Sequence, residues 1–294
     1  MKELKLWLSI IRPKTLFASI CPVIAAFIID QNIFIPLENN IIIFIITLLC
    51  AVCLQVLSNL INDYYDFKKG TDKAGRIGPQ RALAEGLIDL NQIRHAIFFT
   101  IAISVFCGAF LVYQGGEKIL AIGIAAIVFA WLYTATDYSL SYLGIADIFV
   151  FVFYGIIAVC GTHYLLTDEC FFCRPKITYI GCTCGVISMM LLMINNLRDL
   201  EEDKQAGKKT IPVRFGKFTG EILTLIYALL TGLFSYWAFG FSITNIIVVP
   251  ALMLCIEVKL AKGKQYNRCL MHASILNVLF VILIFAHYFI KDYL

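Results

Sequence analysis

The sequence predicts an all-α, polytopic membrane protein with about nine transmembrane helices, packed as a bundle around a central cavity. Hydrophobic residues make up 60% of the 294 residues and charged residues 15%, whereas soluble proteins average roughly 45–50% and 25%. The apolar residues also form long runs without charge, as helices that cross a bilayer require. A soluble domain of this size would lack the polar surface that keeps it in solution.

Eight uncharged runs place the helices along the chain. Most of them are close to the roughly 20 residues that a spanning helix needs. The run 222–256 is too long for one helix, and Gly240, Ser242 and Asn245 predict a turn that divides it into two spans. The runs are 15–29, 39–62, 95–116, 119–136, 148–167, 177–197, 222–256 and 269–290.

The distribution of lysine and arginine predicts the orientation. If the N-terminus lies in the cytoplasm, the loops between these nine helices place 20 of the 24 basic residues on the cytoplasmic side. Cytoplasmic loops of membrane proteins carry such an excess. We therefore expect a multi-pass protein of the plasma membrane, with the N-terminus and the two acidic segments described next on the cytoplasmic side.

Two acidic segments follow the second and the sixth predicted helix. The first reads NDYYDFKKGTD over 62–72 and the second NNLRDLEED over 195–203. The spacing Asn59-x-x-x-Asp63-x-x-Asp66 recurs as Asn195-x-x-x-Asp199-x-x-Glu202. Four helices separate the copies, so both run in the same direction, as in a parallel repeat with its site at the repeat interface.

The repeat predicts the domain organisation. We expect one transmembrane domain over 1–294, with pseudo-repeat halves at about 10–136 and 144–260 and a ninth helix at 269–290.

The acidic segments also predict a metal site. Carboxylates at i, i+4 share a helix face and repel each other unless a cation lies between them. Oxygen ligands without a nearby His or Cys cluster favour Mg²⁺, which takes one or two carboxylates and completes its shell with water and phosphate. Two facing clusters predict two Mg²⁺ ions that bridge a diphosphate. The candidate ligands are Asn62, Asp63, Asp66, Asp72, Asp199, Glu202 and Asp203, of which Asp66, Asp199 and Asp203 are the candidates for catalysis.

The segments resemble those of a known family, the UbiA superfamily of intramembrane prenyltransferases. That family carries an N-D-x-x-D type motif after its second helix and D-x-x-x-D after its sixth. Further stretches are similar to its menaquinone branch, and together they cover about residues 12–216. They are RPKTL (12–16), RIGPQRALAEG (76–86), LYT…YLG…D (132–147) and RDLEEDKQAGKKTIPVRFG (198–216).

The resemblance implies an activity: Mg²⁺-dependent transfer of a polyprenyl group from polyprenyl diphosphate to 1,4-dihydroxy-2-naphthoate, giving demethylmenaquinone. By resemblance and charge, the candidate diphosphate partners are Arg12, Lys68, Arg81 and Lys209. The candidates for binding the aromatic acid acceptor are Tyr133 and Asp147. The chain departs from the branch at 135–137, where Ala-Thr-Asp replaces Gly-Gly-Pro, so 4-hydroxybenzoate and haem stay open as acceptors.

Other functions make different predictions. A cation-coupled transporter would carry its acidic residues near the bilayer midplane on broken helices, and a CDP-alcohol phosphatidyltransferase would carry the absent D-G-x-x-A-R pattern. No nucleic-acid partner is expected. Single charges at a helix end are usually only solvated, and we expect Cys170 and Cys173 to be unconnected thiols.

Overall fold

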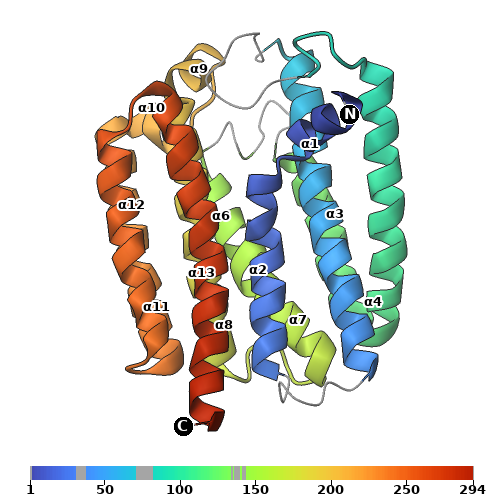
Figure 1. The fold of residues 1–294 in the computed structure, drawn as a ribbon. Coiled ribbons are helices and arrows are strands. Elements are labelled where there is room, and N and C mark those ends of the chain that lie inside the picture. Colours follow the sequence, from blue (N-terminus) through green and yellow to red (C-terminus); the bar gives the residue numbers. More distant parts are fainter. Residues whose placement is uncertain are drawn as a thin grey trace.

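The computed structural model describes residues 2–30, 38–70, 82–133, 135, 140 and 144–293. All regular structure in these ranges is helical. Most helices stand side by side in one bundle (Figure 1). The predicted all-α membrane fold is therefore confirmed.

Within those ranges, eight helices are long and apolar enough to cross a membrane. One of them, α4 (Leu90–Leu132), has 43 residues, about twice what a bilayer requires. It is interrupted at Gly116, whose φ of 65° and ψ of −153° are not helical. Because glycine adopts positive φ at little cost, the chain reverses here and α4 forms two antiparallel arms. Counted separately, the arms bring the segments to the nine that were predicted.

The remaining segments follow in chain order. They are α2 (Pro13–Asp30), α3 (Glu38–Lys68), α6 (Ala146–Phe151) continued through η1 (Val152–Ile157) into α7 (Ala158–Thr167), α8 (Pro175–Arg198), α11 (Lys217–Phe239), η2 (Ile243–Ile247) with α12 (Val248–Leu260), and α13 (Tyr266–Tyr293). Gly240 ends α11 with a φ of 65°. The turn predicted inside the run 222–256 is thus confirmed.

In the described ranges, four short helices lie outside the spans: α1 (Lys2–Ile11), α9 (Leu200–Gln205), α10 (Ile211–Phe215) and η3 (Gly263–Gln265). The end of the bundle that carries α1, α9 and α10 is called the acidic end below. It is at the top of Figure 1, and the C-terminus lies at the opposite, far end. The sequence did not predict α1 as a helix, because its lysines interrupt the apolar pattern.

Helix α8 forms the centre of the fold. It packs against α2, η1, α7, α11 and α13, and almost all of its residues are buried. The first and last spans also pack together, and Ser274 of α13 donates a hydrogen bond of 2.7 Å to the carbonyl of Lys14. The bundle therefore closes around α8.

Small residues allow η1 to cross α8 closely. A Cβ added to Gly155 would lie 2.5 Å from the carbonyl oxygen of Gly181 and 2.5 Å from the Cα of Gly185. Such contacts between backbones are typical of helix pairs in membranes. The crossing therefore depends on glycine at these positions.

Replacement of Gly155 by alanine is expected to lower the melting temperature by several degrees, since overpacking costs about 1–3 kcal/mol. Thermal unfolding of the purified protein measures the effect. Gly123→Ala is the matched control, because a Cβ there meets no atom within 4 Å. Equal melting temperatures for the two variants would refute the close-crossing account.

The loop between α7 and α8 corrects one expectation. Cys170 and Cys173 form a disulfide, so the prediction of unconnected thiols was wrong. The loop holds them close: Asp168 ends α7 in a left-handed conformation, and the amide of Cys173 donates to the carbonyl of Cys170 at 3.3 Å. The other nine cysteines are free and mostly buried.

Candidate active site

A cavity of about 730 Å³ runs between α2, α3, α4, α6–α7 and α8. Residues of α3 line it at intervals of three or four, from Thr47 through Cys50, Leu54 and Ser58 to Asn62. At 1.5 Å per residue this stripe is about 22 Å long. The predicted central cavity is therefore present, and it reaches the acidic end.

The mouth of the cavity at the acidic end is polar. Arg12, Asn59, Asn62 and Asn195 line it. The amide oxygen of Asn62 is buried and has no hydrogen-bond partner among the described residues. Such an oxygen costs free energy unless a ligand satisfies it. The mouth therefore offers an oxygen ligand to which none of the described residues donates.

The acidic residues lie one helical turn beyond the asparagines. Asp66 follows Asn62 by four residues at the end of α3, and Asp199 follows Asn195 by four residues at the end of α8. Asp66 is 0% exposed and Asp199 4% exposed. Both sit at helix ends rather than in the middle of a span, contrary to the pattern expected of a transporter.

Lys208 joins the two acidic segments. Its Nζ lies 3.1 Å from Oδ2 of Asp66 and 3.8 Å from Oδ1 of Asp203. Asp66 belongs to α3, whereas Asp203 belongs to α9 and is 7% exposed. The carboxylates of the two segments therefore meet around one cation.

Two arginines hold two other aspartates. Arg12 forms an ion pair with Asp63. Arg198 donates through Nε and Nη2 to the two carboxylate oxygens of Asp199, at 2.6 and 2.7 Å. It also donates to the side chain of Asn195 at 2.7 Å. Asp63 and Asp199, equivalent in the predicted repeat, are thus both paired with arginine.

The backbone at Arg12 is strained. Its φ is 57°, a left-handed conformation that costs roughly 1–2 kcal/mol for a residue with a Cβ. Pro13 begins α2 and disfavours an α conformation at the preceding residue. The kink between α1 and α2 directs Arg12 to both Asp63 and the cavity mouth. Such strain is often found at functional sites.

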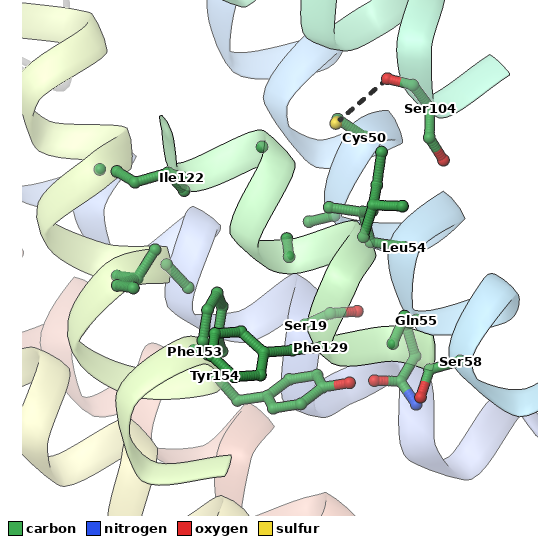
Figure 2. Close-up of a pocket in the computed structure, with 18 of the residues that line it drawn as sticks. Ser19, Cys50, Leu54, Gln55, Ser58, Ser104, Ile122, Phe129, Phe153 and Tyr154 are labelled. Carbon is green, nitrogen blue, oxygen red and sulfur yellow. Dashed lines mark hydrogen bonds between the residues drawn. The ribbon is translucent and has the colours of Figure 1, made fainter. Parts of the chain in front are cut away.

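Aromatic rings lie just inside the mouth. Phe129 packs against Phe149 and Phe153 with centroid distances of 4.5 and 5.0 Å. Figure 2 shows Tyr154 beside Phe129 and Phe153, with its hydroxyl on the side of Gln55. The cavity thus changes from polar at the mouth to aromatic and then to aliphatic.

Of the two predicted acceptor residues, one reaches the cavity. Tyr133 lines it. Burial raises the pKa of Tyr133, and the charges of Asp147 and Asp203 raise it further, so its hydroxyl stays protonated. Asp147 is 5% exposed and accepts a hydrogen bond of 3.5 Å from Tyr227. It is not among the described residues that line the cavity.

The remaining predicted site residues are dispersed. Glu202 is half-buried on α9, Lys68 is exposed with its Nζ 4.8 Å from the ring centroid of Tyr64, and Lys209 is exposed. Asp72 and Arg81 lie outside the described residues.

In the part of the chain that is described, no three His, Cys, Asp or Glu side chains form a group that could hold a metal by itself.

Sequence reasoning missed Arg198 and Lys208. Arg198 could have been found as the basic residue next to Asp199 at the end of an apolar run. Lys208 was one of three lysines after the second acidic segment, and the sequence gives no reason to prefer it to Lys209. Gln55 and Ser58 are polar residues inside an uncharged run, and they stand at helical spacing from Asn59 and Asn62. This pattern could have predicted a helix face that lines a cavity.

Comparisons with known proteins agree with this geometry. A model described as the UbiA prenyltransferase family matches residues 19–288. The chain is 34% identical over 265 residues to the 1,4-dihydroxy-2-naphthoate octaprenyltransferase of Haemophilus influenzae, covering 86% of this chain and 84% of the relative. It is 31% identical over 299 residues to the protein of that name from Escherichia coli, covering 95% and 94%.

The solved structure of a UbiA homolog from Archaeoglobus fulgidus bound to DMAPP and Mg²⁺ superposes with a TM-score of 0.66. It is 18% identical and covers 95% of this chain and 98% of its own. At this identity the likeness concerns the fold.

Proposed function

The chain belongs to the UbiA prenyltransferase family, and we propose that it transfers a polyprenyl group from polyprenyl diphosphate to 1,4-dihydroxy-2-naphthoate. The reaction depends on Mg²⁺, releases diphosphate and the acceptor's carboxylate as CO₂, and gives the quinol form of demethylmenaquinone. The observation that carries this proposal is the meeting of Asp66 and Asp203 around Lys208, at the polar mouth of a long apolar cavity. The choice of the naphthoate as acceptor and of an octaprenyl tail rests on the names of the relatives.

The residues at the mouth fit Mg²⁺. The buried amide oxygen of Asn62 lacks a donor among the described residues, and the carboxylates of Asp66 and Asp203 are close enough to share one cation. We infer that Asn62, Asp66, Asp199 and Asp203 hold two Mg²⁺ ions, with Asp63, Asp72 and Glu202 in support. When bound, Mg²⁺ stabilises the negative charge of the diphosphate as the carbon–oxygen bond breaks.

The chain's own cations assist the same step. Arg12 lies at the mouth beside Asp63, and Lys208 lies between Asp66 and Asp203. Either can donate charge-assisted hydrogen bonds to a diphosphate. We propose Lys68, Arg81 and Lys209 as further partners, because they follow the acidic segments. Cations fixed before the reaction stabilise a leaving diphosphate without reorganisation.

The cavity shields the allylic cation from water. Phe129, Phe149 and Phe153 pack together beside Tyr154, and ring faces attract cations. Tyr133, protonated and at the cavity wall, donates a hydrogen bond to the acceptor. Asp147 lies one layer behind this wall, and we propose that it supports the acceptor site rather than touching the acceptor.

We propose that the acidic end faces the cytoplasm in the plasma membrane. The charge distribution of the loops supports this, and so does the disulfide at the far end, because disulfides persist in oxidising compartments. We also propose that residues 1–294 are one domain, with pseudo-repeat halves at about 10–136 and 144–260. The arginine-paired aspartates Asp63 and Asp199 support the repeat.

The test uses purified protein, labelled octaprenyl diphosphate and Mg²⁺ with 1,4-dihydroxy-2-naphthoate or 4-hydroxybenzoate. We expect transfer to the naphthoate, abolished by EDTA and restored by excess Mg²⁺. Transfer to 4-hydroxybenzoate alone would overturn the acceptor, and absence of any transfer would overturn the reaction.

Replacement of Lys208 by methionine is expected to lower the melting temperature of the metal-free protein by several degrees. The variant removes the positive charge that lies between the buried carboxylates of Asp66 and Asp203. Mg²⁺ should then stabilise the variant more than the unchanged protein, because the metal replaces the lost charge. Thermal unfolding with Mg²⁺ and with EDTA measures both effects. Lys204→Met, at an exposed lysine of α9, is the control. If it melts like Lys208→Met under both conditions, the shared-cation account is wrong.

A further inference from the structure

The loop between α7 and α8 carries an exposed disulfide at the far end of the bundle (Figure 1). Cys170 and Cys173 are both exposed, and they are three positions apart in the chain. A disulfide stabilises a fold mainly by closing a loop in the unfolded chain, and the effect is smallest for short loops. This disulfide therefore contributes little as a staple, and its exposure leaves it open to attack by thiols.

The position of Cys173 favours its release from the disulfide. Cys173 directly precedes Arg174, the N-cap of the 24-residue helix α8, and the amide of Ile177 donates to the carbonyl of Arg174 at 3.0 Å. The N-terminal end of a helix stabilises a thiolate. Arg174 also forms an ion pair with Glu169 of the same loop. When a thiolate attacks the Sγ of Cys170, Cys173 is therefore a good leaving group.

The same loop holds two side chains against the bundle. Phe171 stacks on Tyr164 of α7, with ring centroids 4.8 Å apart. Tyr164 in turn donates a hydrogen bond of 3.0 Å to the carbonyl of Gly115 in α4. Oε2 of Glu169 lies 3.6 Å from Nε2 of His163 in α7. The disulfide therefore closes a loop that packs on α7 and, through Tyr164, is connected to α4.

His163 is the buried member of these contacts. Its side chain and that of Asp30 are each 1% exposed, and its Nδ1 lies 2.7 Å from Oδ1 of Asp30. The other ring nitrogen, Nε2, is buried and has no hydrogen-bond partner among the described residues. Such a nitrogen costs free energy, and the nearby carboxylate of Glu169 offsets part of that cost. The pair joins α2 to α7 beside Gly161 and Thr162, which line the cavity.

We propose that Cys170 and Cys173 form a thiol–disulfide exchange site, and that its redox state controls the contact of Glu169 with the buried His163–Asp30 pair. A thiolate attacks Cys170, forms a mixed disulfide and releases Cys173 as a thiolate. A second thiol then displaces Cys170. The protein gains two electrons and two protons, and the two external thiols leave as their own disulfide. Reduction releases the loop and weakens the junction of α2 and α7, whether or not the proposed prenyl transfer is correct.

The exchange is tested on the folded protein in detergent, with glutathione as the thiol. A maleimide added after reduced glutathione has been removed should label two thiols in each chain, and oxidised glutathione should abolish the labelling. The other nine cysteines are free and mostly buried, so the double variant Cys170→Ser with Cys173→Ser should stay unlabelled. Peptide mass spectrometry identifies the labelled residues. A disulfide that glutathione opens only after a denaturant is added would overturn the exchange site.

The effect on the buried pair is tested by thermal unfolding of both redox states. Reduction should lower the melting temperature of the unchanged protein by about 2–4 °C. In Glu169→Gln the decrease should be at most half as large, because the carboxylate that the loop holds beside His163 is already absent. Asp168→Asn is the matched control, since it removes the same charge from an exposed position of the same loop, and its decrease should equal that of the unchanged protein. Equal decreases in all three proteins, or none in the unchanged protein, would overturn the control of the buried pair.

Discussion

Replacement of Asp66 by asparagine is expected to lower kcat for prenyl transfer about a thousandfold, the size of effect seen when a fixed electrostatic contact to a transition state is removed. Asp66 is 0% exposed and lies 3.1 Å from Lys208, so its carboxylate is fixed at the cavity mouth. Asparagine keeps the shape of the side chain but removes the charge. The fold should persist, because no volume is lost. Single-turnover transfer of a labelled prenyl group measures the loss.

The control for this variant is Glu201→Gln. It removes the same charge from an exposed position on α9, two residues from Asp203. Its kcat should stay within about twofold, because an exposed charge at this distance is screened. A loss common to both variants would show that Asp66 acts only through the net charge of the acidic end. A loss confined to Asp66→Asn, restored in part by raised Mg²⁺, would support a metal ligand.

Replacement of Arg198 by methionine is expected to destabilise the fold by about 3–5 kcal/mol, since it removes the two charge-assisted hydrogen bonds that Arg198 donates to the buried carboxylate of Asp199. The side chains of Arg198 and Asp199 are 3% and 6% exposed. A melting temperature lower by on the order of 10 °C is the expected readout. The double variant Arg198→Met with Asp199→Asn should recover part of the loss, because the buried negative charge that Arg198 neutralises is then absent.

An exposed ion pair provides the comparison for this prediction. Arg268 donates to Glu257 at 2.6 Å but is itself 65% exposed. Surface pairs contribute about 0–1 kcal/mol, so Arg268→Met should shift the melting temperature by a few degrees at most. Similar shifts for Arg198→Met and Arg268→Met would contradict the burial argument. A double variant no more stable than Arg198→Met would show that the lost hydrogen bond to Asn195 dominates.

The fold was largely predictable because its determinants are local. A run without charge has the length of the bilayer, and it therefore predicts a spanning helix. The excess of basic residues in alternate loops predicts the direction of each helix. The turn at Gly116 and the end of α11 at Gly240 lie where glycine allows a positive φ. Helix α1 was missed because charged residues divide its apolar positions and leave no run.

The candidate site was predictable only within each segment. Spacing indicates that Asn62 and Asp66 share a helix face, but the meeting of Asp66 with Asp203 depends on how α3 and α9 pack in space. The same holds for Lys208, which is 142 positions from Asp66 in the chain. Arg198 and Asp199 are adjacent in the sequence. The sequence does not show that both side chains are buried, and their burial is the reason why the pair is expected to matter for stability. Metal binding at these residues stays a prediction.

The enclosure of α8 has a consequence for how the protein is made. Chains are synthesised from the N-terminus, and the helices that complete the cover of α8, α11 and α13, emerge after it. Until α13 is inserted, α8 lies against lipid with Asn195 and Arg198 at its end. The hydrogen bond from Ser274 to Lys14 then joins the last span to the first. The cover of α8 is therefore complete only once α13 is inserted, and a chain that stops before α13 leaves one face of α8 open.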